Sequence, residues 1–154
     1  MEQRINAFEK SPGALNAMYG LGIYLAKSPV EQSLLNLLYF RVSQINGCAY
    51  CLDMHSKDLR AAGETEQRLF LLDAWREAPF YSDRERAALA WAEAVTKIPG
   101  GQVADEVYNE ACKQFSDQEL IDLTMAIITI NSYNRINIAF RAQAGGYVVG
   151  QHAV

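Results

Sequence analysis

Residues 44–55 read Gln-Ile-Asn-Gly-Cys-Ala-Tyr-Cys-Leu-Asp-Met-His, which places two cysteines and a histidine within eight positions. Cys48 and Cys51 are three residues apart and His55 is four residues beyond Cys51, so an α-helix would present all three on one face. The preceding Asn46-Gly47 pair is a break signal, which predicts that a helix begins at or beside Cys48. Both thiols would then lie in the first helical turn, where unpaired backbone N–H groups and the positive end of the helix dipole favour a thiolate.

Three kinds of chemistry fit this cluster. A dithiol can attack a peroxide oxygen or a disulfide sulfur and then close to a disulfide, while the histidine moves a proton. Alternatively, Cys48, Cys51 and His55 are three zinc ligands. A structural zinc site takes four and only Cys112 and His152 remain, but a catalytic site with three protein ligands escapes this objection. In the third interpretation they are two small buried cysteines and a core histidine. The spacing favours redox chemistry over the other two.

The composition indicates one soluble globular domain. The chain has 154 residues, of which 50% are hydrophobic and 21% charged, enough to bury a substantial core. A net charge of −4 argues against a nucleic-acid binder, and no apolar run reaches membrane-spanning length. The first residues lack the basic-then-apolar order of a secretory signal, so we expect a cytoplasmic protein, in which a CxxC pair indicates redox or metal chemistry.

Helical periodicity recurs along nearly the whole chain, which predicts a single all-α domain over residues 1–154, a helical bundle joined by short turns. Ser82 with Glu85 and Ser116 with Glu119 are capping-box patterns that mark two helix starts. Helices are expected at about 11–27, 30–44, 48–62, 66–75, 83–98, 103–115, 117–133 and 134–143.

Several apolar and sulfur-containing side chains are interpreted as core. Cys112 lies in an amphipathic segment and is expected to be a small packing residue rather than a participant in chemistry. Trp75 and Trp91 should each find a partner for the indole N–H if they are buried. Packing is also expected of Ile127, Ile128 and Ile130.

The stretch SQINGCAYCLDMH at residues 43–55 resembles the core signature of the AhpD-like alkylhydroperoxidases, within the carboxymuconolactone decarboxylase superfamily. Two downstream stretches, ERAALAWAEAVT at 85–96 and YNRINIAFR at 133–141, resemble a peroxidase-related branch, so the likeness covers about residues 30–142. The resemblance implies an all-helical domain that assembles as trimers or hexamers and a peroxidase reaction without metal, haem or other cofactor. It disfavours decarboxylation, because the lactone decarboxylases lack the dithiol.

The resemblance also implies a role for each residue of the cluster. Cys51 would be the peroxidatic thiolate that becomes a sulfenic acid. Cys48 would protonate the leaving group and then resolve the sulfenic acid as a Cys48–Cys51 disulfide, while His55 relays protons. The implied partners are a hydroperoxide and a thiol or dithiol reductant, with neither nucleic acid nor membrane. The alternative is an adaptor that uses the same dithiol to sense oxidation or pass electrons without turnover.

One position departs from the family pattern. A glutamate that completes the proton relay is expected twelve residues before the first cysteine, and here that residue is Asn36, which cannot exchange a proton. Glu31 lies on a different side of the helix at about 100° per residue. Glu93, in the second resembling stretch, is either a catalytic substitute supplied from another helix or an ordinary solvated glutamate.

Three further residues near these stretches have open interpretations. Tyr50 stands where the pattern often has histidine, and it either lines the pocket or covers it. Asn134 and Arg135 belong either to the site or to a subunit contact, and the sequence gives no basis for choosing between them.

Overall fold

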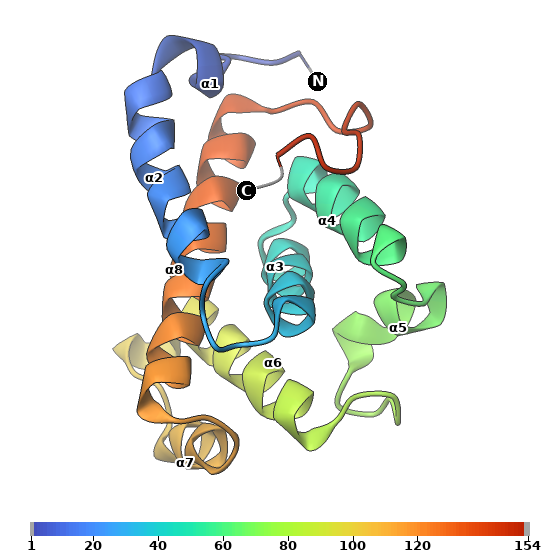
Figure 1. Ribbon diagram of the computed structural model, residues 1–154, viewed down its shortest axis with the longest axis vertical. Coiled ribbons are helices and arrows are strands. Elements are labelled where there is room, and N and C mark those ends of the chain that lie inside the picture. Colours follow the sequence, from blue (N-terminus) through green and yellow to red (C-terminus); the bar gives the residue numbers. More distant parts are fainter. Residues whose placement is uncertain (1, 153–154) are drawn as a thin grey trace.

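Helix α3 (Gln32–Asn46) lies at the centre of the fold, packed against α4 (Ala49–Ala61), α6 (Asp83–Lys97) and α8 (Asp117–Phe140). The computed structural model describes residues 2–152, and Figure 1 shows helix α2 (Pro12–Leu25) running alongside α8. The other helical segments are α1 (Ala7–Lys10), α5 (Glu66–Leu71), α7 (Asp105–Gln114) and the 3-10 turns η1 (Leu72–Ala74) and η2 (Pro99–Gly101). Every regular element of the described residues is helical, which confirms the all-α prediction.

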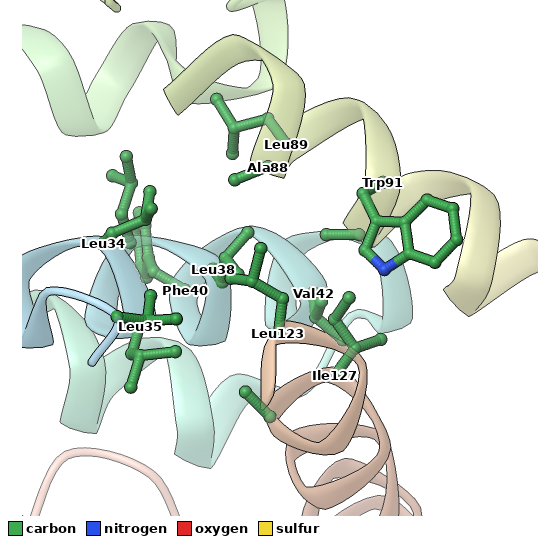
Figure 2. Close-up of a cluster of buried hydrophobic side chains, with 14 of the residues drawn as sticks. Leu34, Leu35, Leu38, Phe40, Val42, Ala88, Leu89, Trp91, Leu123 and Ile127 are labelled. Atoms are coloured by element: carbon green, nitrogen blue, oxygen red, sulfur yellow. The ribbon is translucent and has the colours of Figure 1, made fainter. Parts of the chain in front are cut away.

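The core lies where α3, α6 and α8 meet, and their apolar side chains point toward one another in Figure 2. Leu38, Leu89 and Leu123, one from each helix, are fully buried, and burial of each such side chain contributes about 1.5–3 kcal/mol. Because neighbours cover α3 on several sides, its buried positions extend around most of the helix. They are Leu34, Leu35, Leu37, Leu38, Phe40, Arg41, Val42 and Ser43.

The capping signals in the sequence mark real helix ends. Ser82 and Ser116 each accept a hydrogen bond from the backbone N–H of the glutamate three residues on, and each glutamate side chain accepts one from the serine backbone. The two indole N–H groups also find partners, as expected, with Trp75 donating to Glu93 and Trp91 to Thr124.

Several expectations about helix boundaries were wrong. Helix α8 continues from Asp117 to Phe140, where two helices meeting near Tyr133 were expected, because no glycine or proline interrupts that stretch. The segment 66–75 divides into α5 and the 3-10 turn η1, and the short helix α1 was not foreseen. Within residues 2–152, no helix combines the length and apolar character needed to cross a bilayer.

Two residues expected in the core lie at the surface. Cys112 is exposed, beside Tyr108 on α7. Ile128 is 45% exposed, whereas its neighbours Ile127 and Ile130 are buried as expected. Both corrections have the same cause: periodicity identifies an apolar stripe, but the neighbouring helices decide which part of the stripe is covered.

The segment after α8 returns across α4, as the red trace in Figure 1 shows. The Gly145 N–H donates to the Asp53 carboxylate at 2.9 Å, and the Tyr147 hydroxyl donates to Asp58 at 2.8 Å. Lys57 donates to the Tyr147 carbonyl at 3.0 Å. The helix that carries the CxxC motif is therefore held on its outer side by the C-terminal segment.

Candidate active site

The turn between α3 and α4 places both thiols at the start of α4. Gly47 ends α3 in the left-handed conformation, at φ 68°, which glycine adopts without steric cost. Cys48 follows in an extended conformation as the N-cap residue, and its N–H donates to the Ser43 carbonyl at 3.1 Å. Cys51 is then the third residue of α4. The predicted helix start beside Cys48 is confirmed, with both thiols at the positive end of the helix dipole.

The two sulfur atoms are in direct contact. The Cys48 thiol donates a hydrogen bond to Cys51 Sγ at 2.8 Å, and both residues are buried. This hydrogen bond lowers the pKa of Cys51 to about 7, although burial of the thiol opposes the shift. The same contact, together with burial, raises the pKa of Cys48. At neutral pH Cys51 is thus the residue that carries thiolate and Cys48 the one that keeps its proton.

Helix α8 supplies amide groups to the opposite side of the dithiol. Asn137 Nδ2 donates to Cys51 Sγ at 3.3 Å. One turn earlier, Asn134 Nδ2 donates to Ser43 Oγ at 3.1 Å, and Asn134 Oδ1 accepts from Asn46 at 2.9 Å. Asn137, Asn134 and Ser43 each contribute to the lowered pKa of Cys51. Asn134 therefore belongs to the surroundings of the site rather than to an exposed contact surface.

The sequence interpretation did not select Asn137. A signal was present, because asparagines recur at 131, 134 and 137, a spacing of three that keeps them near one face of a largely apolar helix. Polar side chains on a buried helix face need hydrogen-bond partners, and these partners turned out to be at the α3–α4 turn. Arg135, between them, is exposed and donates to Asn131 instead.

A cavity of about 180 Å³ borders Cys51, His55 and Asn137. Its wall comes mainly from α2, α3, α4 and α8 and is largely aromatic and apolar. The other wall residues are Phe8, Tyr19, Gly22, Tyr39, Tyr50, Met54, Thr129, Ile130, Tyr133 and His152. A small molecule with an apolar substituent could therefore be enclosed with its reactive end at Cys51.

His55 borders the cavity as a neutral imidazole. Burial lowers its pKa to about 4, well below neutral pH. Its ring lies beside Tyr39, with ring centroids 5.5 Å apart, and its buried Nε2 finds no hydrogen-bond partner among the described residues. An unpaired buried nitrogen is costly, and a bound molecule could satisfy it.

Tyr50 lines the cavity and contacts the C-terminal segment. It is one of the wall residues, and its hydroxyl is 2.9 Å from His152 Nε2. His152 in turn stacks on Phe8, with ring centroids 6.0 Å apart. Of the two interpretations of Tyr50 left open by the sequence, the structure supports the one in which it lines the pocket.

Glu93 lies in a separate buried ion-pair cluster, away from the cavity wall. Its carboxylate accepts hydrogen bonds from Arg41 at 2.7 Å, from the Trp75 indole at 2.9 Å and from Arg76 at 2.7 Å. Burial raises the pKa of Glu93, but these three donors outweigh it and the net shift is downward. Because Glu93 is only 8% exposed, the interpretation as a solvated glutamate is wrong. Glu93 is therefore the counter-ion of Arg41 and does not belong to the dithiol cluster.

No three His, Cys, Asp or Glu side chains are grouped so as to hold a metal ion in the part of the chain that the structure describes. The geometry of residues 2–152 therefore gives the zinc interpretation no support.

The chain is similar to several known proteins. The model of the carboxymuconolactone decarboxylase family matches residues 11–94. An uncharacterised Bacillus subtilis protein, YdfG, is 42% identical over 144 residues, which cover 94% of this chain and 98% of that protein. The alkyl hydroperoxide reductase AhpD of Mycobacteroides abscessus is 39% identical over 70 residues, 42% of this chain and 40% of that protein.

A solved structure from Agrobacterium tumefaciens has the same fold. That protein, of unknown function and named as a candidate antioxidant defence protein AhpD, is 41% identical to this chain and superposes with a TM-score of 0.90. The superposition covers 95% of this chain and 100% of the other.

Proposed function

We propose that this chain, which belongs to the carboxymuconolactone decarboxylase family, reduces hydroperoxides with the Cys48–Cys51 dithiol. One observation carries the proposal: Cys51 borders an apolar cavity and accepts a 2.8 Å hydrogen bond from the Cys48 thiol, which lowers the pKa of Cys51 to about 7. An attacking thiol works best when its pKa is near the ambient pH. The partial match to proteins named alkyl hydroperoxide reductase supports the same class of reaction.

In the first step, the Cys51 thiolate attacks the terminal oxygen of a hydroperoxide ROOH. The O–O bond breaks, Cys51 becomes a sulfenic acid, and the alkoxide leaving group takes the proton of the Cys48 thiol to leave as the alcohol ROH. Sulfur is oxidised by two electrons and the peroxide is reduced by two. The contact between the two sulfur atoms supports this proton path, because the donor already points at the reacting atom.

In the second step, Cys48 attacks the Cys51 sulfenic sulfur. The Cys48–Cys51 disulfide forms, and the leaving hydroxide is released as water after it takes a proton from solvent. A thiol or dithiol reductant then restores both thiols by disulfide exchange. A reducing compartment such as the cytoplasm would supply such thiols.

His55 is proposed to assist as a neutral group. With its pKa lowered to about 4, the imidazole can hydrogen-bond to the bound peroxide and pass a proton transiently, but it carries no charge at neutral pH. Its unpartnered Nε2 supports this role. Glu93 has no part in the proposed reaction, because its carboxylate is occupied by Arg41, Trp75 and Arg76.

The test is intact-protein mass spectrometry before and after one equivalent of an organic hydroperoxide, with an alkylating quench. Loss of two hydrogens, mapped to the peptide containing Cys48 and Cys51, is the expected result. Cys112→Ser is the matched control, since this exposed thiol lies outside the cluster and its loss should leave the reaction intact. Unchanged peroxide consumption in both Cys51→Ser and Cys48→Ser would refute the proposal. Ready disulfide formation without turnover by any thiol would favour the redox-adaptor role instead.

Association of identical subunits is proposed as well. Ile121 and Ile128 are 62% and 45% exposed, and they lie two turns apart on one face of α8. Tyr24 on α2 is half-exposed and bonds to Asp122, next to Ile121. An apolar surface of this kind supports burial against another copy of the chain.

A further inference from the structure

Among the residues that the structure describes, the cavity wall around Cys51 provides no lysine or arginine to balance the charge of its thiolate. A buried thiolate requires stabilisation, and cations are the usual means. The position where the family pattern would place a carboxylate is Asn36.

Four titratable neighbours of Cys51 also carry no positive charge at neutral pH. Burial lowers the pKa of His55 to about 4, and it raises the pKa of Tyr39 to about 12. The pKa of Tyr50 is raised, chiefly by burial, and that of Cys48 is raised by its bond to Cys51. His152 bonds to the Tyr50 hydroxyl, not to a sulfur. Uncharged donors must therefore stabilise the thiolate.

Two such donors reach Cys51 Sγ: the Cys48 thiol at 2.8 Å and the Asn137 carboxamide at 3.3 Å. They differ in what happens during the reaction. Cys48 gives up its proton and then becomes part of the disulfide, whereas an amide keeps its hydrogens throughout. Asn137 is thus a side-chain donor within 3.3 Å of the sulfur that can persist through attack and sulfenic acid formation.

We propose that Asn137 is a catalytic residue, which holds the Cys51 sulfur anion by its side-chain N–H while Asn134 positions the α3–α4 turn behind it. This inference rests on the proposed peroxidase function for its catalytic meaning, but the hydrogen bond can be tested without peroxide. Asn134 also contributes to the lowered pKa of Cys51, but its hydrogen bonds are to Ser43 and Asn46, so we assign it a positioning role.

The side-chain geometry suits this division. Asn134 and Asn137 are three residues apart on α8, so they lie on neighbouring parts of one helix face. Asn134 is fully buried and spans from Ser43 to Asn46, the residues on either side of the last turn of α3. The loop that carries Cys48 is thereby fixed against the helix that carries Asn137.

The experiment is a titration of the Cys51 thiolate by absorbance at 240 nm, in a Cys112→Ser background so that the exposed thiol does not contribute. Asn137→Leu removes the donor at similar volume. We expect its titration midpoint to rise by about one to two pH units, the size expected for loss of one hydrogen bond to a charged group. The matched control is Asn131→Leu, the same change on the same helix. Asn131 also reaches the α3–α4 turn, where its Oδ1 accepts from Asn46, but its amide donates to Thr96 and the Ile127 carbonyl and not to sulfur.

A midpoint in Asn137→Leu within about 0.3 pH unit of the parent, a difference below what one hydrogen bond to an anion contributes, would overturn the inference. An equal rise in both leucine variants would also overturn it. Should Asn137→Leu fail to fold, the unmutated chain answers the question: the side-chain amide ¹⁵N resonance of Asn137 should shift with the Cys51 midpoint, and a resonance that stays constant refutes the bond. Because neither measurement uses peroxide, a protein without turnover could still show the bond. If the protein reduces peroxide but the titration midpoint is unshifted in Asn137→Leu, the proposed function stands and only the proposed role of Asn137 is refuted.

Discussion

Replacing Cys48 by alanine removes the hydrogen bond that contributes most to the low pKa of Cys51, while serine at the same position keeps a donor. The pKa of Cys51 is lowered from 9.0 to about 7 in the intact site, with burial acting in the opposite direction. Without the Cys48 donor, Cys51 should therefore return toward 9. At pH 7 the thiolate fraction would fall from about one half to about 1%, roughly a 50-fold loss.

The observed rate should fall by less than this, because a more basic thiolate is a better nucleophile. With a Brønsted slope of about 0.4–0.5, a rise of two pH units in the pKa increases the intrinsic rate by roughly 6- to 10-fold. We therefore expect sulfenic acid formation in Cys48→Ala to be about 5- to 8-fold slower than in Cys48→Ser at pH 7, if serine retains the whole shift. Above about pH 8 the order should reverse, because the serine variant is then almost fully ionised and the more basic thiolate of the alanine variant reacts faster.

The assay follows sulfenic acid at Cys51 by dimedone trapping and mass spectrometry, from pH 6 to pH 10, after a fixed dose of tert-butyl hydroperoxide. Neither variant can form the Cys48–Cys51 disulfide, so the product accumulates in both and the comparison is direct. Equal pH midpoints in the alanine and serine variants would show that the Cys48 contact does not set the pKa of Cys51. The proposed order of attacker and proton donor would then have no electrostatic basis.

Three other outcomes are expected. The pKa of His55 is about 4 in the folded protein and 6.5 in the unfolded chain, so the free energy of unfolding should decline by up to about 3 kcal/mol as the pH falls from about 6.5 to 4. Urea titrations of His55→Phe should lack this decline. Glu93→Ala should lower the free energy of unfolding by about 3–5 kcal/mol, because it leaves Arg41 buried without its main counter-ion. Glu93→Gln should fold and keep the wild-type midpoint of the Cys51 thiolate titration. A shifted midpoint in Glu93→Gln would show that Glu93 acts on the dithiol. Ile128→Glu should lower the mass measured by light scattering, and an unchanged mass would exclude this face from the interface.

The turn that carries the dithiol and the two capped helix starts could be predicted from the sequence because the interactions that fix them are local. Gly47, Cys48 and Cys51 lie within five residues, and the left-handed turn followed by an extended N-cap needs no distant partner to be anticipated. The same holds for Ser82 and Ser116, whose capping glutamates are three residues away. Local capping and turn interactions of this kind form regardless of how the rest of the chain packs.

Glu93 and Asn137 could not be assigned in this way, because their partners are far away in the chain. Asn137 meets Cys51 across 86 residues, and Glu93 meets Arg41 across 52. A helical pattern shows that each lies on a face that is partly buried, but not which helix packs there. Glu93 stood in a stretch that resembled the family and was a natural candidate for the missing relay; the packing of α6 against α3 directs it to Arg41 instead.

The absence of a relay carboxylate at Asn36 has a consequence for how the dithiol would work. A carboxylate beside the Cys51 thiolate would repel it, so neutral donors favour ionisation but leave Cys48 as the nearest proton source. The pKa of Cys48 is high chiefly because its proton is shared with Cys51, and that cause disappears once Cys51 is a sulfenic acid and no longer an anion. In the proposed reaction, giving the proton to the departing alkoxide and becoming a nucleophile would then be one event, and it would leave Cys48 ionised in contact with the sulfur that it attacks. The proposed cycle would then need no separate base for resolution, and the neutral His55 would serve the first step, by its hydrogen bond to the peroxide and transient transfer of a proton.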